Sequence, residues 1–150
     1  MNPFLMKRLI YCFSLVLILA CSNDEGNRNP YLQENGFRFE INLNLPLYSP
    51  LTNIGNAVYV GNQGVGIRGA FVIKSGFDQY MAWEASCPNH APNACSTMEL
   101  SGQTVICSCE DFEYNLFTGQ QANRPDDGKQ YYDLLFYQSS FSNNTVIISN

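Results

Sequence analysis

The cysteine pattern near the middle of the chain constrains the fold more than any other sequence feature. Four of the six cysteines lie close together, at Cys87, Cys95, Cys107 and Cys109, and the only histidine, His90, lies among them. Cysteines clustered in this way form disulfides or bind a metal. Four cysteines allow three pairings, and the spacing does not choose among them. A single histidine excludes any site that needs two imidazoles.

The first twenty residues have the features of an export signal. Lys7 and Arg8 give a positive start, and the apolar run from Leu9 to Ala20 is too short to span a bilayer as a mature helix. The run ends in Ile18-Leu19-Ala20-Cys21, which resembles the lipobox of bacterial lipoproteins. This resemblance implies cleavage before Cys21 and attachment of lipid to its thiol. An ordinary secretory signal with an incidental cysteine is the alternative.

Residues 21–36 are polar and lack periodicity, which predicts a flexible tether ahead of one domain at 37–150. The stretch Ser22-Asn23-Asp24-Glu25 resembles the acidic segment that sends some lipoproteins to the outer leaflet. We therefore expect a cell-envelope protein, anchored through Cys21 to the outer membrane or cell surface. Disulfide formation is the default for cysteines in that compartment.

The charge balance argues against nucleic acid as a partner. The formal net charge of the chain is −5, and two of its eight basic residues, Lys7 and Arg8, lie in the predicted signal. Binding to phosphate backbones needs a surface rich in lysine and arginine, which this domain lacks. A protein partner in the envelope remains possible, but the sequence does not identify it.

The body of the chain predicts an all-β fold. Apolar residues alternate with polar ones over 37–45, as in a half-buried strand, and Pro46 ends the run. Glycine- and asparagine-containing turns separate the later apolar runs, and no window longer than one turn favours a helix by apolar spacing. Short strands at this spacing suggest a small sandwich or barrel. Further strands are expected at 57–60, 70–74, 80–85, 104–107, 114–117, 133–137 and 145–149, with a structured loop at 86–100.

Two motifs give the chain a resemblance to a known family. Cys87-Pro88-Asn89-His90 precedes Cys95, and Cys107-Ser108-Cys109-Glu110 precedes a strand that ends in Thr118-Gly119. In order and spacing, these motifs resemble the two cluster-binding loops of Rieske iron–sulfur domains. The resemblance covers about 37–148. It implies a small Rieske-like β-sandwich or barrel with a cysteine-bearing loop subdomain. It also implies Cys87 and Cys107 as thiolate ligands, with a disulfide between Cys95 and Cys109.

The departures from the family pattern concern the second half of the ligand set. A Rieske [2Fe–2S] cluster takes two cysteines on one iron and two histidines on the other. Asn89 and Glu110 stand at the histidine positions. His90 lies one residue late, and we expect that slip to turn it away from the metal. A carboxylate is also a hard ligand in a site made for thiolate and imidazole.

We therefore expect a domain that has lost its cluster, carries no cofactor or resident metal, and serves as a structural or interaction module rather than an enzyme. The alternative is an electron-transfer protein whose [2Fe–2S] cluster is held by Cys87, Cys107, His90 and Glu110. No Gly-x-Ser-x-Gly motif supports a hydrolase.

Two further alternatives for the cysteines stay open. Without iron, Cys87 and Cys107 could form a second disulfide, which would stabilise the fold by roughly 3 kcal/mol if unstrained. A zinc site could instead be made from Cys87, His90 and Cys95 with Cys107 or Cys109 as the fourth ligand.

Overall fold

The computed structural model describes residues 28–33 and 35–150. The predicted signal, the lipidation site Cys21 and the first part of the predicted tether lie outside these residues. Within the described part of the chain, no helix has the length and apolar character needed to cross a membrane.

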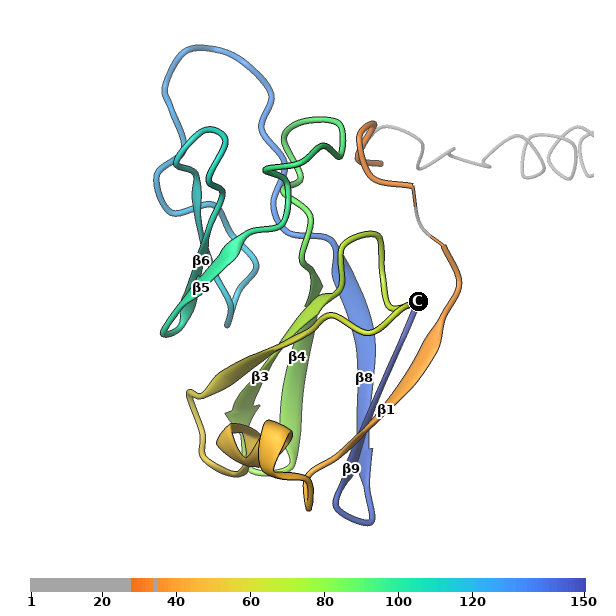
Figure 1. Cartoon of the computed structure of the whole chain (residues 1–150). Coiled ribbons are helices and arrows are strands. Elements are labelled where there is room, and N and C mark those ends of the chain that lie inside the picture. Colours follow the sequence, from red (N-terminus) through yellow and green to blue (C-terminus); the bar gives the residue numbers. More distant parts are fainter. Residues whose placement is uncertain (1–27, 34) are drawn as a thin grey trace, which may run out of the picture.

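The main body is a curled, antiparallel sheet of six strands, which confirms the predicted all-β class (Figure 1). The strands follow the order β1-β9-β8-β4-β3-β2 across the sheet. The first and last strands of the domain therefore lie side by side, with Ile41 opposite Val146. The strands are β1 (Arg38–Asn42), β2 (Ala57–Val60), β3 (Ala70–Gly76), β4 (Gln79–Glu84), β8 (Phe136–Ser142) and β9 (Thr145–Ser149).

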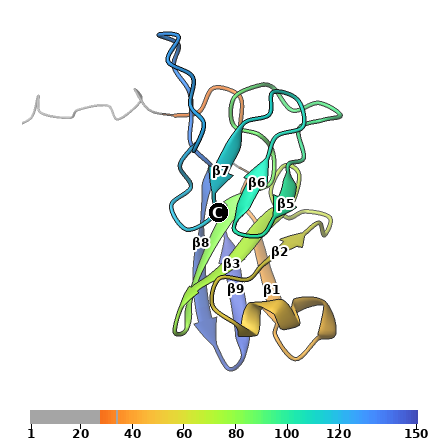
Figure 2. The same cartoon turned by 90° about the vertical axis from the view of Figure 1, so that its left-hand side faces the viewer.

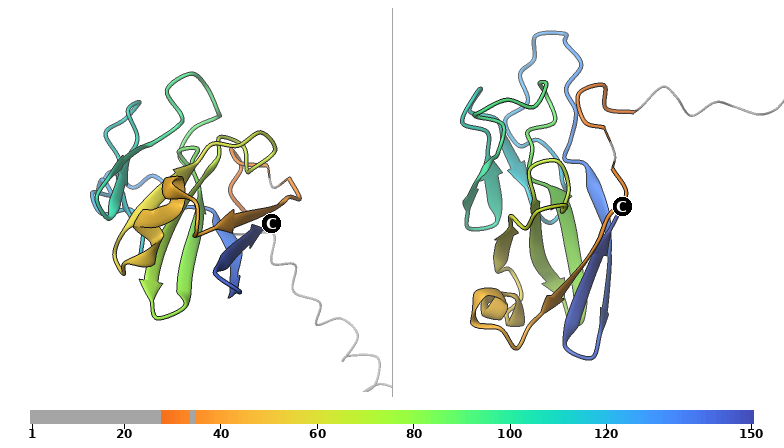
Figure 3. Two further views of the ribbon diagram at one scale, coloured as in Figure 1. Left: turned by 60° about the horizontal axis from the view of Figure 1, so that its bottom comes forward. Right: turned by 45° about the vertical axis from the view of Figure 1, so that its right-hand side comes forward.

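A second, smaller sheet forms the cysteine-bearing subdomain. It consists of β5 (Glu99–Ser101), β6 (Thr104–Ile106) and β7 (Glu113–Asn115), paired antiparallel in that order. Figure 2 shows this sheet beside the upper half of the main sheet. A short 3₁₀ helix, η3 (Pro46–Thr52), lies at the opposite end, far from the cysteine-bearing loops (Figure 3).

The middle strands β3 and β4 are buried on both faces. One face packs into the core enclosed by the curled main sheet, and the other face packs against the small sheet. Val72 and Ala82 pack into the core of the main sheet. Phe71 and Trp83, whose side chains point the other way, pack against the small sheet. This explains why β3 begins with four consecutive apolar residues, 70–73, rather than with an alternating pattern.

Trp83 joins the two sheets. Its indole Nε1 donates a hydrogen bond of 2.7 Å to the carbonyl of Leu116, just after β7. Gly119 adopts a φ of +73°, and a Cβ at this position would lie 2.5 Å from the Trp83 ring. The Thr118-Gly119 turn noted in the sequence is thus the place where the small sheet's backbone contacts this tryptophan directly, which only glycine allows.

A buried carboxyl group at the end of β4 holds three chain segments together. The Glu84 side chain is fully buried and accepts backbone N–H hydrogen bonds from Ile67 (2.7 Å), Arg68 (2.9 Å) and Ser86 (2.7 Å). The Tyr137 hydroxyl donates a further hydrogen bond to it from β8. Glu84 therefore fixes the point at which β4 leaves the sheet and the first cysteine-bearing loop begins.

The strand predictions were accurate for most of the body, and the differences have physical causes. The runs 57–60 and 145–149 match β2 and β9, whereas β8 begins at Phe136, three residues later than predicted. Two short elements were missed, β5 and η3; a 3₁₀ helix of seven residues leaves little apolar periodicity to detect. Two strand aromatics, Tyr59 and Phe136, have side chains that are about two-fifths exposed.

The last part of the predicted tether packs on the domain rather than extending from it. The Leu32 side chain is buried. Asn29 Nδ2 donates a hydrogen bond of 2.8 Å to the carbonyl of Pro88, in the first cysteine motif. Tyr31 contacts Tyr132 edge to face. One buried leucine in a polar segment gives no periodic signal, which is why the sequence did not reveal this contact.

We predict that Glu84→Ala lowers the free energy of unfolding by about 3 kcal/mol or more, because one buried and two partly buried N–H groups lose their acceptor, at about 1–3 kcal/mol for each buried group. Glu84→Gln keeps one acceptor oxygen and should lose less. Urea unfolding of both variants measures the loss. Glu113→Ala, an exposed change on β7, is the control and should stay within about 0.5 kcal/mol of wild type. A loss below 1 kcal/mol for Glu84→Ala would contradict the prediction.

Candidate metal centre

Two loops at the same end of the molecule carry the cysteine motifs. The first ligand loop, residues 85–98, follows β4, and the second ligand loop, residues 107–112, joins β6 to β7. Each starts from a buried strand end: Cys87 and Cys107 are both fully buried and belong to the apolar cluster between the two sheets. Two cysteines that are distant in the sequence are thereby held facing one another on the apolar cluster between the sheets.

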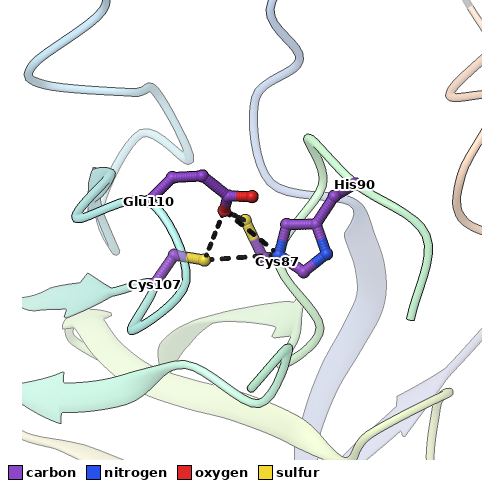
Figure 4. A group of neighbouring side chains, drawn as sticks. All are labelled: Cys87, His90, Cys107 and Glu110. Atoms are coloured by element: carbon purple, nitrogen blue, oxygen red, sulfur yellow. Dashed lines mark hydrogen bonds and ion pairs between the residues drawn. The ribbon is translucent and has the colours of Figure 1, made fainter. Parts of the chain in front are cut away.

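Four donor side chains meet between these loops, two from each (Figure 4). All their ligand atoms lie within 4.8 Å of one another. Cys107 Sγ lies 3.4 Å from His90 Nε2 and 3.1 Å from Glu110 Oε2. His90 Nε2 lies 3.2 Å from Glu110 Oε2, and Cys87 Sγ lies 4.0 Å from the same oxygen. We call Cys87, His90, Cys107 and Glu110 the donor quartet.

The position of His90 corrects the prediction that its one-residue slip turns it away. Its side chain is only 14% exposed and faces Cys107 and Glu110. The next residue orients the His90 ring toward the site in spite of the one-residue shift: His90 Nδ1 lies 3.0 Å from the carbonyl of Ala91. A carbonyl cannot donate, so Nδ1 carries a proton and the Nε2 side of the ring faces the quartet, where it offers a lone pair once Nε2 has lost its own proton.

Asn89, which stands at the family's histidine position, has a different partner. Its Oδ1 accepts a hydrogen bond of 2.7 Å from the backbone N–H of Tyr132, and its Nδ2 donates to the carbonyl of the same residue at 2.9 Å. Nδ2 also donates to the Tyr114 hydroxyl at 2.8 Å. The amide thus ties the first ligand loop to the segment before β8. Asn89 and His90 point in different directions, which is how His90 occupies the site.

The two thiols are electrostatically distinct. The hydrogen bond from Cys107 lowers the pKa of Cys87, and the backbone N–H of Asn89 lowers it further, against the effect of burial. The same hydrogen bond, together with burial, raises the pKa of Cys107 well above its usual range. The hydrogen bond from Cys107 therefore favours the thiolate form of Cys87.

The charge environment of His90 favours the protonated ring. Burial lowers the pKa of His90, but hydrogen bonds to the Ala91 carbonyl and the Cys107 sulfur, with the negative charge of Glu110, outweigh that effect and raise it. Tyr114 has its own pKa raised, chiefly by burial, and its hydroxyl lies 3.7 Å from Cys87 Sγ. Since Asn89 already donates to this hydroxyl, its hydrogen can be directed to the sulfur.

Cys95 and Cys109 are joined by a disulfide, with their Cα atoms 5.6 Å apart. This is the pairing that the family resemblance implied. It removes both residues from the zinc ligand set that the sequence left open, because a disulfide sulfur is not a thiolate ligand. Cys87 and Cys107 are free thiols, so the second disulfide considered from the sequence is not formed. The disulfide and the donor quartet both connect the first ligand loop to the second.

The donor quartet does not fit the [2Fe–2S] cluster that the resemblance implies. That cluster needs two thiolates on one iron and two imidazoles on the other, so its donors form two separated pairs. Here one imidazole is replaced by a carboxylate, and the nitrogen and oxygen contact Cys107 directly instead of lying across a cluster from it. The donors form one compact group around a single point.

The sequence identified all four members of the quartet but not what surrounds them. Asn89 was treated only as a missing ligand, and neither Tyr114 nor Glu84 was assigned a role at the site. The one available signal was a glutamate inside an otherwise apolar strand, since buried acidic residues are rare unless they are fully hydrogen-bonded.

Comparison with known proteins gives little beyond the fold. No family model and no curated protein matches the chain. A search of solved structures finds a chain from the complex of reduced oxygenase and oxidized ferredoxin in carbazole 1,9a-dioxygenase, with 23% sequence identity and a TM-score of 0.44. The match covers 65% of this chain and 82% of that one. The curled six-stranded sheet with its small second sheet is consistent with a small Rieske-like β fold, and a similarity of this size says nothing about function.

We predict that the loop disulfide can be separated experimentally from the two free thiols. Alkylation of the denatured protein without reductant should modify Cys87 and Cys107, and Cys95 and Cys109 should react only after reduction; peptide mass spectrometry assigns each site. Replacing both Cys95 and Cys109 by serine should lower the free energy of unfolding by about 3 kcal/mol, from the chain entropy of a loop of this length. Protection of Cys87 or Cys107 before reduction would contradict the assignment.

Proposed function

We propose that this chain is a lipid-anchored envelope protein whose Rieske-like domain does not hold a two-iron cluster and acts as a structural or interaction module. The observation that carries the proposal is the compact arrangement of the donor quartet. A thiol, an imidazole and a carboxylate in mutual contact leave no separated second pair of ligands for a second iron.

The role of Asn89 supports the same conclusion. Its side chain makes three hydrogen bonds that connect the first ligand loop to Tyr114 and Tyr132. A histidine at this position would leave the backbone groups of Tyr132 without these partners. Position 89 therefore serves the loop framework in this chain, and the fold does not depend on a cluster at that point.

The anchoring part of the proposal rests on the sequence of the first 36 residues. The lipobox-like run ends at Cys21, and a polar segment follows it. The described end of that segment lies against the first ligand loop through Asn29 and Pro88. An anchored chain would thus enter the domain beside the donor quartet, at the end of the molecule away from η3.

The test of the missing cluster is direct. We predict that the full chain, produced with iron and sulfide supplied and purified without air, lacks the visible charge-transfer absorption of an iron–sulfur protein and contains no acid-labile sulfide. The physical reason is the absence of a second imidazole and of a separated ligand pair. About two irons and two sulfides per chain, with a reversible one-electron reduction, would replace this proposal by the electron-transfer alternative.

The test of the anchor uses Cys21. In cells fed a labelled fatty acid, the wild-type chain should incorporate label and fractionate with membranes, because two or more acyl chains give stable anchoring. Cys21→Ala should lose the label, whereas Cys12→Ala, a change within the predicted signal, should keep it. Equal labelling of wild type and Cys21→Ala would exclude this lipidation site.

A further inference from the structure

We propose that the donor quartet binds one divalent cation of the zinc class, with Cys87 and Cys107 as thiolate ligands, His90 through Nε2, and Glu110 through a carboxylate oxygen. This inference rests on the proposed function, since a chain that assembles a two-iron cluster would use the same thiols. It assigns to this fold a mononuclear site made from two residues of each ligand loop.

The distances among the donor atoms carry the inference. Zinc bonds of about 2.0–2.3 Å at tetrahedral angles separate neighbouring donors by about 3.3–3.8 Å. The contacts of Cys107 with His90 and Glu110 are 3.4 and 3.1 Å, and His90 lies 3.2 Å from Glu110. Cys87 lies 4.0 Å from Glu110, and every pair is within 4.8 Å. A single ion at the centre needs side-chain shifts of only a fraction of an ångström for most of these atoms.

The donor types also match. Two sulfurs, one nitrogen and one oxygen are all ligands that zinc accepts in a four-coordinate site. Harder cations such as Ca²⁺ and Mg²⁺ require oxygen donors, of which the quartet offers only one residue. Binding would displace the protons of both thiols into solvent as the metal–sulfur bonds form.

A group behind one of the ligands holds it in place. The Ala91 carbonyl accepts from His90 Nδ1, which is the usual outer partner of a histidine that binds metal through its other nitrogen.

The site is buried at the two cysteines and most exposed at Glu110. Cys87 and Cys107 form its buried floor, and His90 covers a side with 14% of its side chain exposed. Glu110 is 37% exposed and lies at the entrance. An ion would therefore enter past Glu110, and this carboxylate is the ligand that an incoming water or a partner's side chain could replace.

The experiment uses the full chain in detergent, kept under reductant, with Zn²⁺ and Co²⁺ as probes. We expect one Zn²⁺ per chain by elemental analysis, a rise in melting temperature with Zn²⁺, and the visible bands of tetrahedral, thiolate-ligated Co²⁺ when cobalt is bound instead. Alkylation mapped to individual cysteines should show Cys87 and Cys107 protected by Zn²⁺ and reactive after its removal with chelator.

The variants test each ligand against a matched control. His90→Ala and Glu110→Ala lie at the partly exposed side of the site and should fold as wild type does. Each should weaken Zn²⁺ binding by roughly 100-fold or more, since loss of an outer partner alone costs about 10–100-fold. Glu113→Ala, a nearby exposed glutamate outside the quartet, should bind as wild type does. Equal affinity of Glu110→Ala and Glu113→Ala would remove Glu110 from the ligand set and overturn the four-ligand assignment.

The outcomes distinguish this inference from the proposed function. A folded, colourless chain with both thiols reduced that binds neither Zn²⁺ nor Co²⁺ would overturn the inference and leave the proposed function intact. Two irons with acid-labile sulfide would overturn both. One Zn²⁺ per chain that is lost in His90→Ala and retained in Glu113→Ala would establish the site.

Discussion

The position of the ligand loops depends on one buried side chain, that of Glu84. Its carboxyl group collects backbone N–H groups from the 65–69 turn and from Ser86, and the Tyr137 hydroxyl binds it from β8. Gly66, with a φ of +56°, leaves the space that this carboxyl group needs, because a Cβ there would lie 2.6 Å from Oε2. The sheet thus ends at a fixed point, and Cys87, three residues later, starts from a known place and direction.

From that point, two cross-links of different chemistry join the loops. The disulfide between Cys95 and Cys109 is covalent and lies toward the outside, whereas the donor quartet lies deeper, with two of its members in the apolar cluster between the sheets. The disulfide fixes Cys95 to the second ligand loop. It thereby restrains residues 91–94, which connect Cys95 to His90. The disulfide therefore restrains the loop that carries His90, in addition to the hydrogen bond between His90 and Ala91.

Much of the fold was predictable because period-two patterns and glycine turns are local signals. The site was predictable in membership, since Cys87, His90, Cys107 and Glu110 all stand in the two motifs, but not in geometry. Position-by-position comparison assigned the ligand role to residue 89 and predicted that His90 would face elsewhere. Which of two adjacent side chains enters a site depends on partners distant in sequence, here Tyr114 and Tyr132, and no local pattern encodes them.

The one-residue shift of the histidine changes which kind of metal group the domain can bind, rather than removing its ability to bind one. A histidine at 89 together with one at 110 would supply a second pair of nitrogens for a second iron. Because the Asn89 side chain is hydrogen-bonded elsewhere, the imidazole in the site comes from the next residue, His90. This ring contacts Cys107 directly instead of lying across a cluster from it. The four donors then surround one centre. Glu110 completes that centre with an oxygen, which a single zinc-class ion accepts and a redox cluster of thiolate and imidazole does not favour.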